Sequence, residues 1–124
     1  MLIPMIRTLD PSEPAVRIGS NRATFNAAAV RLLGLHSGGY VEFRLDQYNL
    51  DNGRKRIYVS RSLTGSNSFL LHPRKDRQTL EVSSRVLSRT LGDAMDGWGV
   101  YRICREDTTL QDGRRWYGIF LKKY

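Results

Sequence analysis

The chain has 124 residues, of which 40% are hydrophobic and 26% charged, the size and composition of one small globular domain. This composition excludes a chain disordered throughout, and no apolar run approaches the ~18 residues that would cross a bilayer. The formal net charge is +8, and sixteen of the twenty basic residues are arginine, whose planar guanidinium suits bidentate contacts with phosphate and guanine. A domain this basic most often binds nucleic acid, and an acidic protein is the main alternative partner.

Residues 1–14 predict an extended N-terminal arm, because their prolines fix φ and remove backbone donors. We expect residues 15–124 to form a single globular domain. The start of the chain lacks the basic and apolar segments of a secretory signal, so we expect a cytoplasmic protein. Because Cys104 is the one cysteine, the sequence excludes an intrachain disulfide and a cysteine-based zinc site.

Residues 15–61 predict two short strands, a helix and two longer strands. Asn26 is a good N-cap for a helix that ends at Leu33, and Gly34 can end it with a positive φ. Turns are expected at 19–21 and 51–53, where Gly and Asn cluster. The strands expected in this half are 15–18, 22–25, 40–45 and 56–60.

The second half predicts the same order of elements. Ser83 is expected to cap a helix that runs to Leu91, with Gly92 as its stop. Turns are expected at 73–76 and 111–113. The strands expected in this half are 68–71, 78–82, 98–104 and 116–121.

The repeated order extends to individual residues. A shift of sixty positions places Gly39 on Gly99, Leu50 on Leu110, Gly53 on Gly113 and Arg54 on Arg114. A shift of 58 places Leu33-Gly34 on Leu91-Gly92. This agreement indicates an internal duplication of residues 16–61 and 68–121. Because two copies are too few for a solenoid, we expect the halves to share one core.

The first repeat resembles a known family. Arg22–Asn26 followed by Arg31–Phe43 is similar to the swapped-hairpin domain of the AbrB, SpoVT and MazE type, although Asn26 stands where that family usually has Pro. The resemblance implies a mostly-β fold with two short helices, in which two AbrB-like halves form a pseudo-two-fold β-barrel. Family members are usually homodimers and many bind DNA as regulators or antitoxins. A tandem duplication would build the dimer within one chain, so we expect a monomer or a weak homodimer.

The resemblance also suggests where DNA would bind. Arg22 and Arg31 match arginines of the family, Arg17 falls on the same edge as Arg22, and Arg89 is the counterpart of Arg31. The expected nucleic-acid-binding residues are Arg17, Arg22, Arg31, Arg74, Arg77 and Arg89. A second basic group lies beside the long-hairpin turns and is expected to point away from the first: Arg54, Lys55, Arg56, Arg114 and Arg115.

The sequence offers little for catalysis. His36 and His72 have no paired histidine at ligand spacing, and no phosphate-binding Gly-Lys-Ser/Thr loop or nucleophile elbow is present. We therefore expect no enzyme, no cofactor and no metal. Most of the aromatic side chains at strand positions are expected in the core or as cross-strand partners, whereas a minority exposed beside arginine would form a stacking platform for single-stranded nucleic acid. Tyr48 and Tyr124 are expected to be exposed.

Three functions follow from these observations. The leading one is a double-stranded DNA-binding regulator that uses an arginine-rich face, with no membrane partner. The second is an interaction protein, of a phage or mobile element, whose basic surface binds an acidic protein. The third is single-stranded DNA binding through aromatic side chains exposed beside arginine.

Overall fold

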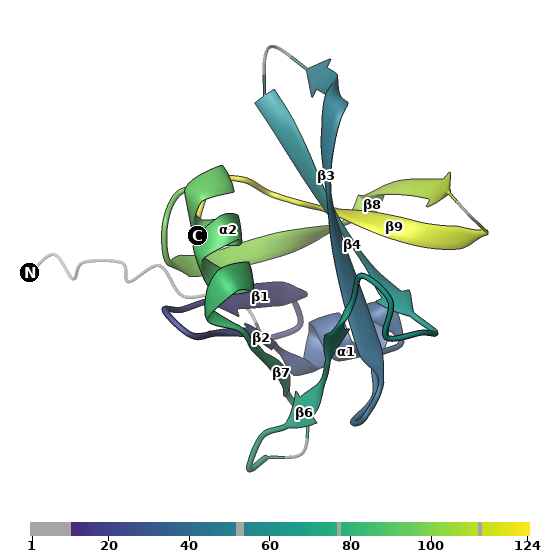
Figure 1. Cartoon of the computed structure of the whole chain (residues 1–124), viewed down its shortest axis with the longest axis vertical. Coiled ribbons are helices and arrows are strands. Elements are labelled where there is room, and N and C mark those ends of the chain that lie inside the picture. Colours follow the sequence, from purple (N-terminus) through teal and green to yellow (C-terminus); the bar gives the residue numbers. More distant parts are fainter. Residues whose placement is uncertain (1–10, 52–53, 77, 112) are drawn as a thin grey trace, which may run out of the picture.

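A computed structural model describes residues 11–51, 54–76, 78–111 and 113–124, with the backbone alone for 46–51, 54–56 and 107–111 (Figure 1). Its elements are β1 (Ala15–Ile18), β2 (Arg22–Phe25), α1 (Ala27–Leu33), β3 (Tyr40–Asp51), β4 (Arg54–Ser62), β5 (Phe69–Leu70), β6 (His72–Pro73), β7 (Leu80–Ser83), α2 (Arg85–Ala94), β8 (Gly99–Gln111) and β9 (Arg114–Ile119). In the part of the chain that the structure describes, no helix has the length and apolar character needed to span a membrane.

The strands form one antiparallel sheet with the order β5-β3-β4-β9-β8-β1-β2-β7-β6. The two ends of this order, β5 and β6, are separated by Leu71 alone. The same short stretch therefore pairs with β3 through β5 and with β7 through β6. The sheet nearly closes into a barrel, and the expected mostly-β barrel with two short helices is confirmed.

The strand pairing relates the two halves by a pseudo-two-fold axis. Thr24 lies opposite Glu81 at the centre of the β2–β7 pair, and Tyr58 lies opposite Gly118 at the centre of the β4–β9 pair. The pairs on the two sides of each centre are related by a two-fold rotation about it. In the first pair of strands Ala23 lies opposite Val82 and Phe25 opposite Leu80, and in the second Ile57 lies opposite Ile119 and Val59 opposite Tyr117. The axis therefore crosses opposite walls of the barrel, through β2–β7 and through β4–β9.

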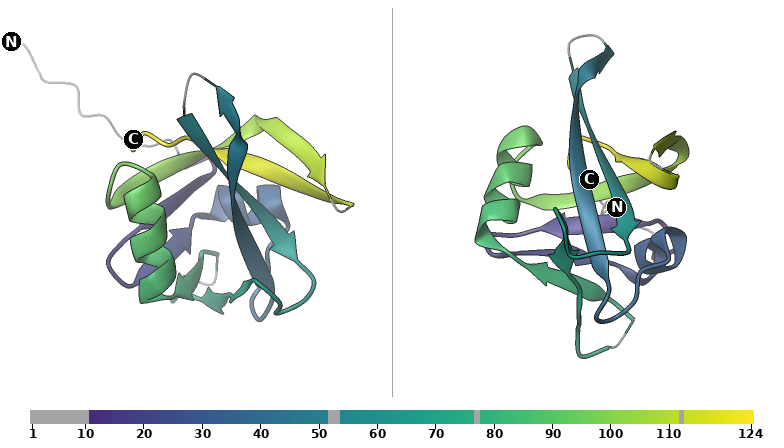
Figure 2. Two further views of the ribbon diagram at one scale, coloured as in Figure 1. Left: turned by 45° about the horizontal axis from the view of Figure 1, so that its top comes forward. Right: turned by 45° about the vertical axis from the view of Figure 1, so that its right-hand side comes forward.

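Each half is completed by the other. The first strand, β1, pairs with β2 of its own half and with β8 of the second half. The corresponding stretch of the second half, β5 and β6, pairs with β7 of its own half and with β3 of the first. The long β3–β4 and β8–β9 hairpins project from the barrel, and α1 and α2 lie on opposite sides of it (Figure 2).

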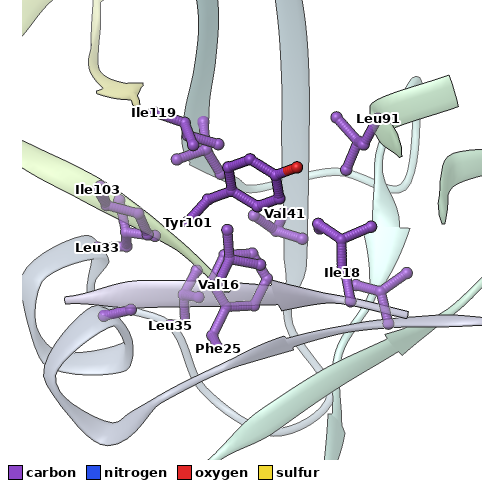
Figure 3. Close-up of a cluster of buried hydrophobic side chains, with 14 of the residues drawn as sticks. Val16, Ile18, Phe25, Leu33, Leu35, Val41, Leu91, Tyr101, Ile103 and Ile119 are labelled. Atoms are coloured by element: carbon purple, nitrogen blue, oxygen red, sulfur yellow. The ribbon is translucent and has the colours of Figure 1, made fainter. Parts of the chain in front are cut away.

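Buried side chains of both halves meet inside the barrel (Figure 3). Alternation in β1 and β2 turns Val16, Ile18 and Phe25 inward and leaves Arg17 and Arg22 outside, because successive side chains of a strand point to opposite faces. The second half contributes buried residues at matching positions: Leu71, Leu80, Val82, Tyr101, Ile103 and Ile119. Burial of each large apolar side chain contributes ~1.5–3 kcal/mol to the stability of this shared core.

The capping of α1 follows the sequence. The Asn26 side chain accepts a hydrogen bond from the Ala29 amide at 2.9 Å, and Gly34 ends the helix with φ 68°. Asn26 also accepts from the Ala15 amide at 3.0 Å and donates to the Glu13 carbonyl at 2.7 Å. One side chain thus joins the helix start, the start of β1 and the segment that leads into it.

The ends of α2 differ from the expectation. Ser83 is not the cap: it remains in β7 opposite Arg22, and Ser84 caps the helix by accepting from the Leu87 amide at 3.1 Å. Gly92 does not stop the helix, which continues to Ala94. The exposed ring of Trp98 lies beside Gly92, with its Cδ1 3.4 Å from the place a Cβ would occupy. Because Gly92 has no side chain, the ring of Trp98 can pack against the helix at this point.

Other boundaries also shift. β8 begins at Gly99 instead of Trp98, and β9 ends at Ile119 instead of Leu121. Pro14 is fully buried and its carbonyl accepts from the Ile103 amide at 2.9 Å, so the last residue of the expected arm packs on the barrel. The rest of the arm up to residue 10, and the tips of both long hairpins at 52–53 and 112, lie outside the described residues.

We expect Asn26→Ala to lower the free energy of unfolding by about 2–3 kcal/mol, because it removes a helix cap and two further hydrogen bonds. Ser84→Ala removes one cap bond and should cost about 1 kcal/mol. Urea denaturation measures both. Equal losses for the two variants would contradict the joining role of Asn26.

We expect the chain to be a monomer, because each half supplies the pairing partners that complete the first strand of the other half. Light scattering at several protein concentrations measures the mass. An obligate dimer at the lowest concentration would contradict this expectation.

Candidate nucleic-acid interface

Side chains that point outward from β6, β7, β2, β1 and β8 form a row across the barrel wall. His72 lies opposite Glu81, Glu81 opposite Thr24, Thr24 opposite Arg17, and Arg17 opposite Val100. We call these five residues the outer row. Because neighbouring strands are ~4.8 Å apart, the row spans roughly 19 Å. Two other features of the surface flank it.

The first feature is a pair of arginines on one carboxylate. Nη1 of Arg22 lies 3.4 Å and Nη1 of Arg74 3.5 Å from the same Oε2 of Glu81. The side chains of Arg22 and Arg74 are 55% and 43% exposed, whereas that of Glu81 is 19% exposed. Two half-exposed guanidiniums that share one carboxylate keep a net positive charge and donors directed to solvent.

The arginines border an open groove of about 480 Å³, which we call the arginine groove; it is lined by Arg22, Pro73, Arg74, Lys75, Asp76 and Glu81. Asp76 shapes the turn at one side of this groove. Its Oδ1 accepts from the backbone amides of Thr79 and Gln78 and from the Thr79 hydroxyl, at 2.9–3.0 Å. The hydrogen bonds from Thr79 and Gln78 hold the pKa of Asp76 below its ordinary value. The ionised carboxylate therefore fixes the turn that carries Arg74 and Lys75.

The predicted binding residues are thus divided. Arg22 and Arg74 meet in the arginine groove, and Arg17 lies beside them in the outer row. Arg31 and Arg89 are exposed on α1 and α2, which lie on opposite sides of the barrel (Figure 1). The side chain of Arg77 lies outside the described residues.

The second feature combines a cation with aromatic side chains at the other end of the outer row. Trp98 and Phe120 belong to the strand aromatics of which most were expected in the core, and these two are 61% and 46% exposed. The guanidinium of Arg102 lies 5.2 Å from the ring centre of Phe120 and 5.5 Å from that of Tyr124. Tyr124, expected to be exposed, is only partly so, and the side chain of Tyr48 is outside the described residues. We call Trp98, Arg102, Phe120 and Tyr124 the aromatic strip.

The C-terminal segment builds this strip. After β9, the Phe120 amide donates to the Arg102 carbonyl at 3.0 Å and the Tyr124 amide to the Val100 carbonyl at 2.7 Å. The segment therefore follows β8 and places its aromatic rings around Arg102. The clue in the sequence is the pair Lys122-Lys123 after Phe120, which is typical of an exposed segment and not of a buried strand.

Part of the second basic group is structural. Arg114 donates from Nη2 to Oε1 of the buried Glu42 at 3.0 Å, and Arg44 donates from Nε to Oε2 of Glu42 at 2.7 Å. Both guanidiniums lie over the ring of Trp116, at 4.5 and 4.6 Å from its centre. Arg115 is exposed, and the side chains of residues 54–56 are outside the described set.

No arrangement for metal chemistry is found among the residues that the structure describes. His36 and His72 are exposed and far apart in the sequence, and Cys104 is half-buried in β8. Comparison of the chain with protein-family models, curated proteins and solved structures found no significant match. The arginine groove and the aromatic strip are therefore the features on which a function can be argued.

We expect Glu42→Gln to lower the free energy of unfolding by about 2 kcal/mol, because it leaves two guanidiniums without their shared buried carboxylate. Glu106→Gln is the matched control, because Glu106 is an exposed carboxylate of β8, and it should change stability by less than about 0.5 kcal/mol. Chemical denaturation compares the two. A stable Glu42→Gln protein would mean that solvent already screens both arginines.

Proposed function

We propose that this protein binds double-stranded DNA without catalysing a reaction, and that the arginine groove holds a backbone phosphate. The observation that carries the proposal is the meeting of Arg22 and Arg74, one from each half, on Glu81. Glu81 belongs to the pair through which the pseudo-two-fold axis leaves the barrel. The net charge of +8 supplies the long-range attraction that a polyanion requires.

The geometry suits a phosphate in the groove. Glu81 engages one nitrogen of each guanidinium, and guanidinium has further N–H donors that can bind an oxyanion. The carboxylate also restrains both side chains before DNA arrives, which lowers the entropic cost of binding. Arg17, on the adjacent strand, supports a second phosphate contact. Such contacts position DNA without reading its sequence, and they weaken with salt because counterions are released.

A regulator of the AbrB type is the biological role that this proposal favours. The pseudo-two-fold axis beside the groove supports it, because symmetric binding proteins match the approximate symmetry of their DNA sites. An acidic protein partner is the competing explanation of the charge, and the experiment below separates the two.

The decisive variant is Arg22→Ala combined with Arg74→Ala. We expect it to weaken duplex DNA binding at least tenfold in low salt and to reduce the slope of log affinity against log salt by about two, one unit for each lost phosphate contact. Mobility shifts at two or more salt concentrations measure both quantities. Circular dichroism checks the fold, which should persist because neither arginine is buried.

The matched control is Arg61→Ala combined with Arg115→Ala. Both arginines are exposed, and they lie on β4 and β9, the wall that the axis crosses opposite the groove. This control should lower affinity only slightly. If it weakens binding as much as the groove variant, the groove is not the site. If the unaltered protein retains no duplex DNA in low salt, the basic surface belongs to an acidic protein partner instead.

A further inference from the structure

We propose that the aromatic strip binds unpaired nucleotides, so that the preferred ligand is a duplex with a single-stranded extension. This inference rests on the proposed function, because the arginine groove would hold the duplex part. In this proposal planar bases stack on the exposed rings of the strip, and the neighbouring cations neutralise the phosphates.

The rings are exposed yet held in place. Trp98 lies against the helix, next to Gly92, and is nevertheless 61% exposed, so the ring is supported by α2 and still open to solvent. Phe120 is 46% exposed, and its backbone is fixed by the hydrogen bond to Arg102. Exposed aromatic side chains of this size are costly to leave in water, and a stacked base would cover them.

The cations lie among the rings. Arg102 lies over Phe120 and Tyr124, and a guanidinium plane itself stacks on bases. Lys123 lies along Gly99, the residue that follows Trp98, with its Cβ 3.3 Å from the place where a Cβ of Gly99 would stand. Lys122 and Lys123 are both exposed. Asp96 is the exposed carboxylate nearest to Trp98 in the sequence. Arg102, Lys122 and Lys123 outnumber it, so positive charge dominates this segment.

The strip and the groove share one continuous surface. Val100 and Arg102 alternate with the buried Tyr101 and Ile103 in β8, so both point to the outside of the sheet, and the exposed Trp98 lies just before this strand. Val100 begins the outer row, which reaches Glu81 three strands away, roughly 15 Å. A duplex anchored at the groove can therefore place a strand that leaves it on the strip.

The two tryptophans provide the measurement. Trp116 is 1% exposed and enclosed by arginines, whereas Trp98 is 61% exposed, so quenching of tryptophan fluorescence on DNA binding reports Trp98. The ligands are oligothymidylate, a blunt duplex, and the same duplex with a thymidine extension. We expect quenching by oligothymidylate and by the extended duplex, little quenching by the blunt duplex, and about tenfold tighter binding of the extended duplex than of the blunt one.

Variants separate the strip from the groove. Trp98→Ala, and independently Phe120→Ala, should abolish most of the tenfold preference, as followed by anisotropy of labelled DNA, and leave blunt-duplex affinity unchanged. Arg102→Lys keeps the charge but loses the planar group, so it should lower the preference about threefold. Leu63→Ala is the control, because Leu63 is 80% exposed on a different loop and should change nothing.

The outcomes are distinct for the two proposals. If the protein binds the blunt and extended duplexes equally, or if Trp98→Ala and Phe120→Ala both keep the preference, the strip does not bind bases and the inference is overturned while the proposed function stands. If the blunt duplex is not bound but oligothymidylate quenches Trp98, the duplex function fails and the strip remains a nucleotide site. Quenching by acidic peptides as strong as that by oligothymidylate overturns the inference in favour of a protein partner.

Discussion

The barrel depends on strand pairing that neither half can provide alone. The first strand of each half is bordered on one side by its own hairpin partner and on the other by a long strand of the opposite half. A unit of this size with one short helix buries too little apolar surface to be stable by itself. Joining two units in one chain brings the turns at 19–21 and 73–76 to the same side of the barrel, near the pseudo-two-fold axis. That arrangement brings Arg22 of one half to Arg74 of the other.

The two halves share the strand pairing but not the side chains on it. Glu42 and Arg102 occupy equivalent positions sixty residues apart, and so do Ser60 and Phe120. In the first half the position carries a buried carboxylate that binds two arginines beside Trp116. In the second half it carries a cation between two aromatic rings. The position in the first half therefore holds ion pairs, whereas its equivalent in the second half is bordered by aromatic rings.

Local signals predicted what depends on local structure. The cap at Asn26, the stop at Gly34 and the short strands at 15–18 and 22–25 are properties of a few adjacent residues, and the structure confirms them. The cap of α2 required knowing that Ser83 pairs with Arg22, a contact across 61 positions that no local pattern contains. For the same reason local patterns could not tell which aromatic side chains at strand positions are exposed: Trp98 and Phe120 are 61% and 46% exposed, and their exposure depends on which segments pack over them.

The groove shows the same division. The basic turn and Arg22 could be selected from the sequence, but their meeting on Glu81 could not, because it depends on the β2–β7 register. Conversely, the sequence places Arg114 only beside a long-hairpin turn, and its role is set by Glu42, 72 positions away. Composition gives the number of cationic side chains, whereas the fold decides which of them are engaged in buried ion pairs and which are exposed to solvent.

The two clusters in which a glutamate binds two arginines, around Glu42 and around Glu81, differ in burial. The Glu42 carboxylate is 7% exposed, so its attraction to Arg44 and Arg114 acts in a medium of low dielectric constant and is strong. If a phosphate replaced the Glu42 carboxylate as the partner of these arginines, Glu42 would be left buried and charged without a counter-ion, which is costly. Glu81 is more exposed, and its contacts with Arg22 and Arg74 are longer, at 3.4 and 3.5 Å. Solvent screens those pairs, so each guanidinium can bind a phosphate through its remaining N–H donors while Glu81 keeps it in place. A carboxylate of this kind positions cations without consuming them, which is what a reversible nucleic-acid contact requires.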